Sequence, residues 1–152
     1  MKLAEALILR ADCNKRFEQL KQRIIRSAMV QEGDEPPENP TELVAELERV
    51  SKELASLIKR INKTNSLTEF QPGVTLADAL ADRDVTLLKR EAYNQIVQNA
   101  SVRQDRYSKS EVKYKTTINV KEIQKQVDEL SKTVRELDSR IQETNWKVDL
   151  ME

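Results

Sequence analysis

The sequence contains no histidine, and this absence removes the largest group of enzyme mechanisms. Histidine is the commonest general base, a leading transition-metal ligand, and the usual partner of serine and cysteine nucleophiles. Di-iron bundles built on a Glu-x-x-His motif are excluded for the same reason. We therefore expect no catalytic residues of these kinds, no metal site and no cofactor.

Glycine and proline are also scarce, with 2 and 4 residues in a chain of 152. Gly33 and Gly73 fall in separate turns, so no glycine-rich loop is available to cradle a phosphate, and a P-loop nucleotide hydrolase is excluded. In their place, 34% of the residues are charged and helix-forming residues dominate. This composition is typical of long helices, and the length suits one domain over residues 1–152.

The single cysteine, Cys13, cannot form an internal disulfide bond. It falls on the apolar face of its helix, so we interpret it as a small buried hydrophobic residue rather than a nucleophile. The apolar run at 6–9 is bracketed by Glu5 and Arg10 and is too short for a signal peptide, and no stretch is long enough to span a membrane. These features predict a cytoplasmic location.

Periodic apolar residues predict an all-α fold, as an antiparallel bundle or a coiled-coil assembly. Its four long amphipathic helices are expected at about 2–30, 40–65, 76–104 and 120–150. Asn39 and Asn119 precede the second and fourth helices as caps, and Pro40 occupies a first helical position. The third helix has an unusually wide apolar arc, with Leu80 and Leu87 on one edge and Val85, Leu88, Ala92 and Ile96 on the other.

One short extended segment is expected at about 112–118, where apolar and polar residues alternate and β-branched residues are frequent. A lone strand needs a partner for its backbone groups. The stretch around Leu67 to Phe70 is the only other weak strand pattern, and in an antiparallel bundle it lies at the opposite end. We therefore expect the segment to pair with its symmetry mate in a twofold homodimer, in which the partner also covers the wide arc of the third helix. The alternative is a linker that runs the whole length of the bundle, which would make the third and fourth helices parallel and bring the two stretches together.

Several polar residues interrupt the apolar seams of the helices. If successive helices are antiparallel, these residues meet near one end of the bundle. They form a predicted buried polar layer of Arg10, Asn14, Asn65, Asp84 and Asn145. One interpretation is a register-setting layer in which Arg10 pairs with Asp84, and the other is a small-ligand pocket.

A basic stretch with two tyrosines offers the ingredients of a nucleic-acid patch, although acidic residues dilute it. Its cations are Arg103, Arg106, Lys109, Lys113, Lys115 and Lys121. Lysine plus arginine equals aspartate plus glutamate at 26 each, so no overall field attracts nucleic acid or an anionic membrane. Such binding would have to be local.

Six short segments distributed over the whole chain carry a resemblance to a known family. They are Leu7–Asp12 (LILRAD), Val30–Pro37 (VQEGDEPP), Ile61–Asn65 (INKTN), Ala81–Asp84 (ADRD), Ser110–Lys113 (SEVK) and the segment QETNWKVDL around Trp146. The chain resembles a small bacterial all-helical family of unknown function, some of whose members are labelled septicolysin. The resemblance implies a helical fold and no established activity.

Most acidic side chains fall on polar helix faces opposite the seams, which favours a solvated surface over carboxylate-pair catalysis. We therefore predict a non-catalytic helical scaffold or interaction protein that associates with copies of itself, most simply as a dimer. A nucleic-acid-associated factor using residues 103–121 and a ligand-binding bundle using the polar layer are the alternatives.

Overall fold

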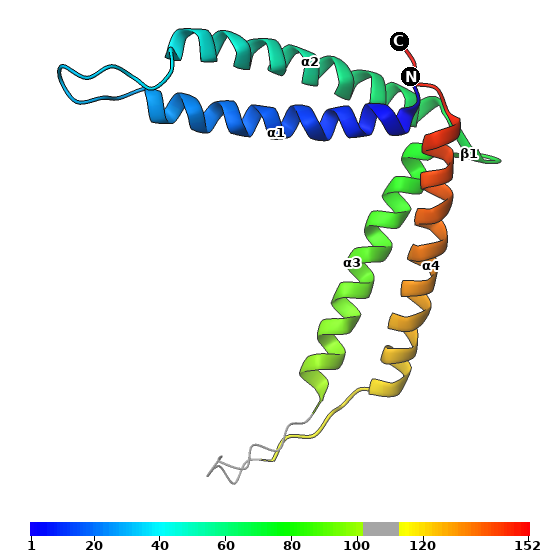
Figure 1. The fold of residues 1–152 in the computed structure, drawn as a ribbon. Helices are drawn as coiled ribbons and strands as arrows, with labels where there is room; N and C mark the ends of the chain where they lie inside the picture. The colour runs from blue at the N-terminus through cyan, green and yellow to red at the C-terminus, as the bar shows by residue number, and fades with distance from the viewer. Residues whose placement is uncertain (102–112) are drawn as a thin grey trace. The chain divides into compact units, whose positions relative to one another are not determined.

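The all-α fold class is confirmed by the computed structural model, which describes residues 1–101 and 113–152. The described residues form four long helices (Figure 1): α1 (Leu3–Ser27), α2 (Pro40–Leu67), α3 (Leu76–Ala100) and α4 (Val120–Lys147). Each begins within one residue of its predicted start. The first, third and fourth end a few residues earlier than predicted, and α2 ends slightly later.

The helix starts depend on local capping, as predicted. The Asn39 side chain accepts a hydrogen bond from the Thr41 backbone N–H at 3.0 Å, at the start of α2. The Asn119 side chain accepts one from the Glu122 N–H at 3.1 Å, at the start of α4. These contacts involve residues two or three apart, so the sequence alone reveals them.

A small hairpin joins α2 to α3. β1 (Glu69–Gln71) pairs antiparallel with β2 (Val74–Thr75), and Gly73 turns the chain between them with a φ of +78°. This positive φ favours glycine because other residues would clash. The Leu76 N–H then donates to the Thr68 carbonyl at 2.9 Å, which fixes the start of α3.

The strand predicted at 112–118 is wrong for its described part, because residues 113–118 are exposed and form no strand. Val112 lies outside the described residues. The weak pattern near Phe70 forms the hairpin instead, since its partner follows immediately and closing so short a loop costs little entropy.

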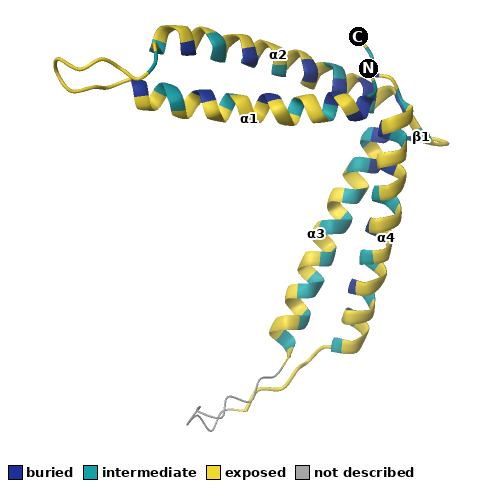
Figure 2. Cartoon of the chain, in the orientation of Figure 1, coloured by how far each residue is buried: buried dark blue, intermediate teal, exposed yellow. Residues whose placement is uncertain are grey.

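The chain divides into two compact units, residues 1–77 with 142–152 and residues 78–141. The single domain over 1–152 stays a prediction. In the first unit α1 and α2 form an antiparallel helical hairpin whose facing seams are buried (Figure 2). The buried seam residues are Leu3, Ala6, Cys13 and Leu20 on α1 and Leu43, Val50, Leu57 and Ile61 on α2. Their spacings of three, four and seven residues match the apolar periodicity that predicts these helices.

In the second unit α3 runs antiparallel beside α4 (Figure 1). The seam of α4 contributes the buried Val127, Val134 and Ile141, as its heptad pattern predicts. A polar contact also joins the helices, because Arg83 Nη1 lies 3.2 Å from Asp138 Oδ1. The helix pair therefore has a buried apolar row on α4 and a mixed apolar and polar face on α3.

Candidate functional site

The predicted polar layer is buried only in part. Asn145 is buried and Arg10 and Asn65 are half-buried, whereas Asn14 and Asp84 are exposed. The prediction of burial is therefore wrong for Asn14 and Asp84. Five polar side chains on apolar seams do not by themselves define an enclosed site.

Asp84 is not the buried partner that the predicted pair with Arg10 requires. Its side chain is 64% exposed, and its ion-pair partner is the neighbouring Arg83 at 3.3 Å. Consecutive helical residues are about 100° apart. Arg83 therefore reaches toward α4 while Asp84 points away from it, so the arc that contains Asp84 is an outer surface of α3 rather than a core seam.

The basic stretch is described only in its second half. Arg103, Arg106 and Lys109 lie outside the described residues. Lys113, Lys115 and Lys121 are exposed, and so is Tyr114. These side chains offer local positive charge and one accessible aromatic ring.

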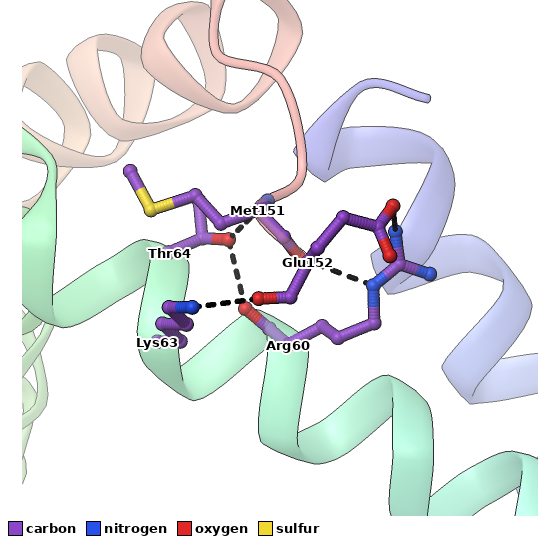
Figure 3. Close-up of polar contacts among 5 residues, drawn as sticks. All are labelled: Arg60, Lys63, Thr64, Met151 and Glu152. Carbon is purple, nitrogen blue, oxygen red and sulfur yellow. Dashed lines mark hydrogen bonds and ion pairs between the residues drawn. The ribbon is translucent and has the colours of Figure 1, made fainter.

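A contact that sequence reasoning missed joins the last residues of the chain to α2 (Figure 3). The Met151 N–H donates to Thr64 Oγ1 at 3.0 Å, and Arg60 Nε donates to the Met151 carbonyl at 3.1 Å. Arg60 Nη2 also lies 2.8 Å from Glu152 Oε1, and Lys63 Nζ donates to the Glu152 main-chain oxygen at 2.8 Å. Thr64 lies one helical step beyond Ile61, where the sequence analysis selected the neighbouring Asn65.

The same segment forms a short antiparallel bridge with the first residues of the chain. The Leu3 N–H donates to the Val148 carbonyl at 2.9 Å, and the Leu150 N–H donates to the Met1 carbonyl at 2.8 Å. Lys2 Nζ lies 2.9 Å from Asp149 Oδ1, and this hydrogen bond holds the pKa of Asp149 below its usual value. Residues 148–152 therefore close the end of the first unit, which is a structural role.

Cys13 has no features of a nucleophile. Its thiol is buried between α1 and α2, and burial together with the nearby Glu53 carboxylate raises its pKa. A reactive cysteine needs a lowered pKa and access to solvent. The interpretation of Cys13 as a small core residue is consistent with both observations.

The described residues contain neither a cluster suited to a metal ion nor a membrane-spanning helix. Within residues 1–101 and 113–152, no three acidic, cysteine or histidine side chains converge on a point that would suit a metal ion. No helix in this part of the chain carries an apolar stretch sufficient to cross a bilayer. An open cavity of about 540 Å³ lies between the last turn of α3 and residues 114–118, and no residue of the predicted polar layer lines it.

Trp146 is the single tryptophan of the chain and lies within the segment QETNWKVDL. A large aromatic side chain of this kind is expected to be mostly shielded. Its side chain is nevertheless 55% exposed. It follows the buried Asn145 directly, and a step of about 100° turns it away from the seam.

The main exposed apolar feature of the second unit is a row on α3 that faces away from α4. We call it the outer stripe, and it consists of Ala81, Val85, Leu88, Ala92 and Ile96, all of them exposed. Val85 is 62%, Leu88 70% and Ile96 41% exposed. The spacing of three and four places these residues on one helix face. They are the outer edge of the predicted wide arc.

The inner edge of that arc faces α4. Ala79 is buried there, and Leu80, Leu87 and Val97 are half-buried. Helix α3 thus carries apolar residues on two opposite sides, mixed with polar residues on the side that faces α4, and α4 covers only that side. Among the described residues, the outer stripe is the surface that best fits a binding role.

Comparison with known proteins places the chain in a family without assigning an activity. None of the curated proteins matches it. A crystal structure described as a functionally unknown conserved protein from Corynebacterium diphtheriae is 47% identical, with a TM-score of 0.94 and 99% of each chain covered. Neither this description nor that of the matching family carries the septicolysin label, so that part of the resemblance stays a prediction. The family model, described as a family of unknown function (DUF6847), matches residues 10–150, and the chain therefore belongs to this family.

Proposed function

We propose that this protein is a non-catalytic helical scaffold that associates with a second copy of itself through the outer stripe of α3. The observation that carries this proposal is the exposure of Val85 and Leu88 on a helix whose opposite face contacts α4. A helix that is apolar on both sides normally has neighbours on both sides. A second copy supplies an identical surface.

The energetics support association of modest strength. Full burial of a valine or leucine side chain contributes about 1.5–3 kcal/mol relative to exposure. Two copies would bury Val85 and Leu88 from each side, while lost translational and rotational freedom opposes the gain. The interface proposed is helical, because the described residues 113–118 form no strand that pairs with a symmetry mate.

The test replaces Leu88 with aspartate and measures the molar mass by light scattering at micromolar concentration. The chain has a mass of 17.6 kDa, so the unaltered protein is expected near twice this value and Leu88→Asp near 17.6 kDa. Leu88 is 70% exposed, so the charge is tolerated by the isolated chain and breaks only an interface that buries it.

Ser139→Asp is the matched control, because Ser139 is exposed on α4 and gains the same charge. Lys115→Pro is expected to keep the dimer mass, since it alters only the former strand candidate. An unaltered protein that remains at 17.6 kDa throughout the concentration range rejects self-association.

A second candidate function is the binding of single-stranded nucleic acid by residues 113–121. The observation in its favour is the exposed Tyr114 ring between the exposed Lys113 and Lys115. Aromatic stacking contributes about 1–3 kcal/mol per base, and lysine contacts to phosphate weaken steeply with salt. If this function is correct, a labelled oligonucleotide binds at low salt, and Tyr114→Ala reduces its affinity roughly tenfold or more. Equal binding by the variant contradicts it.

A further inference from the structure

We infer that the two copies pair their α3 helices in parallel and in register, with Asp84 of each copy facing Lys89 of the other. This inference rests on the proposed self-association and specifies its geometry. It follows from the heptad positions of the outer stripe and from the charges beside it.

From Ala81 to Ala92 the outer stripe follows a heptad pattern of alternating steps of four and three, and Ile96 then falls at an e position. Val85 and Ala92 occupy a positions, and Ala81 and Leu88 occupy d positions. A β-branched residue at a with leucine at d favours parallel two-stranded pairing. Val85 and Leu88 are the two large residues at the centre of the stripe, so they dominate this preference.

The next a position is Asn99, one heptad beyond Ala92. Asn99 is exposed, and its side-chain amide donates to the Gln95 carbonyl at 2.8 Å. Asparagine at a single a position favours a fixed register and a two-stranded state, because its amide pairs with its counterpart. This residue thus agrees with the preference of Val85 and Leu88.

Charges on the two flanks of the stripe complement one another in the parallel arrangement. Asp84 precedes an a position and Lys89 follows a d position, which makes them g and e residues. In a parallel pair, a g residue lies beside the e residue five positions further along the other helix. Each copy therefore supplies one carboxylate and one ammonium group to two symmetric ion pairs.

The contacts that Asp84 and Lys89 make within one copy do not prevent the ion pairs between copies. Asp84 is mostly exposed and contacts Arg83 at 3.3 Å. The Lys89 ammonium lies 5.5 Å from the centroid of the Tyr93 ring, and Lys89 is exposed. Exposed interactions of this kind are weak, so exchanging them for a contact across the interface costs little.

An antiparallel pairing brings one pair of like charges together. When a positions of one copy face d positions of the other, Asp84 lies beside Glu91 of the second copy, while Lys89 lies beside Asp82. The first contact is repulsive and the second is attractive. The parallel orientation keeps an attraction without a repulsion, so the charges favour it.

The test reverses each charge separately and then both together. In the parallel dimer, Asp84→Lys and Lys89→Asp each replace two attractions with two repulsions, and each is expected to raise the dissociation constant roughly tenfold. The double variant restores opposite charges and is expected to return within about twofold of the unaltered protein. Sedimentation equilibrium at low salt measures all four dissociation constants.

An antiparallel dimer, a dimer of another geometry and a monomer each give a different result in this experiment. An antiparallel dimer is tightened by Asp84→Lys, because the new lysine meets Glu91 of the second copy. If neither single reversal changes the dissociation constant, while Leu88→Asp still dissociates the dimer, the inferred geometry is overturned and the proposed function stands. An unaltered protein that never dimerises overturns both.

A covalent readout tests orientation without relying on charge. A disulfide bond needs Cα atoms about 4.4–6.8 Å apart, and equivalent a positions face one another only in a parallel pair. In a Cys13→Ala background, Val85→Cys is expected to form a disulfide-linked dimer under mild oxidation. Lys132→Cys, exposed on α4, is the control that stays monomeric on a non-reducing gel. In an antiparallel pair, Val85 faces Leu88 of the second copy. A disulfide bond that forms only between a Val85→Cys copy and a Leu88→Cys copy therefore contradicts the parallel register.

Discussion

Replacement of Ile61 by alanine is expected to lower the free energy of unfolding by about 3–4 kcal/mol. Ile61 is 0% exposed and lies on the α2 seam between Leu57 and Thr64, both of which are buried. Truncation removes favourable transfer energy and leaves a cavity that rigid helical neighbours fill only partly. Urea denaturation followed by far-ultraviolet circular dichroism measures the loss.

Ile58→Ala is the matched control, because it removes the same atoms from the same helix. Ile58 is 37% exposed, so the expected loss is about 1 kcal/mol. The difference in unfolding free energy between the two variants isolates the effect of burial, because helix propensity favours alanine equally at both positions. Equal losses at the two positions would contradict the assignment of Ile61 to the core.

Replacement of Leu150 by aspartate is expected to lower the free energy of unfolding by about 3 kcal/mol and to release residues 148–152 from the first unit. Leu150 is buried, and its N–H donates to the Met1 carbonyl at 2.8 Å. A carboxylate cannot stay in that site unpaired, so the segment leaves and its backbone hydrogen bonds open. Thermal or urea unfolding measures the stability.

Hydrogen exchange gives this prediction a local readout. The Leu3 and Met151 amides donate to Val148 and Thr64, so both are expected to lose protection in Leu150→Asp. Glu152→Gln is the control, since it weakens only an exposed ion pair with Arg60 and should change stability by less than about 1 kcal/mol. Unchanged protection of Leu3 in the aspartate variant would show that the bridge forms without Leu150.

The sequence predicts which residues form the outer stripe of α3, but it does not predict which way that stripe faces. The sequence identifies Val85 and Leu88 as one edge of a wide apolar arc on the third helix. It does not say which edge packs inside the chain, because both edges have helical spacing. The same ambiguity assigned Asp84 to the core, whereas Arg83 is the residue that reaches α4 and contacts Asp138.

The two chain ends show a different limit. The contacts of Met1 with Leu150 and of Thr64 with Met151 join residues that are far apart in the sequence. Residues 148–152 carry no strand or cap pattern that would predict these contacts. Their hydrogen bonds arise because the first turn of α1 and the last turns of α2 and α4 meet, and only the folded chain brings them together.

Local patterns in the sequence were enough to predict the four helices, their starts and the buried rows of α1, α2 and α4. Asn39, Asn119 and the heptad seams act over three or four residues, so their effect can be read without knowing the fold. Two features became apparent only in the folded chain: residues 148–152 close the first unit, and the stripe of Leu88 faces outward. Both depend on which distant segments pack together, and local propensity carries no information about that choice.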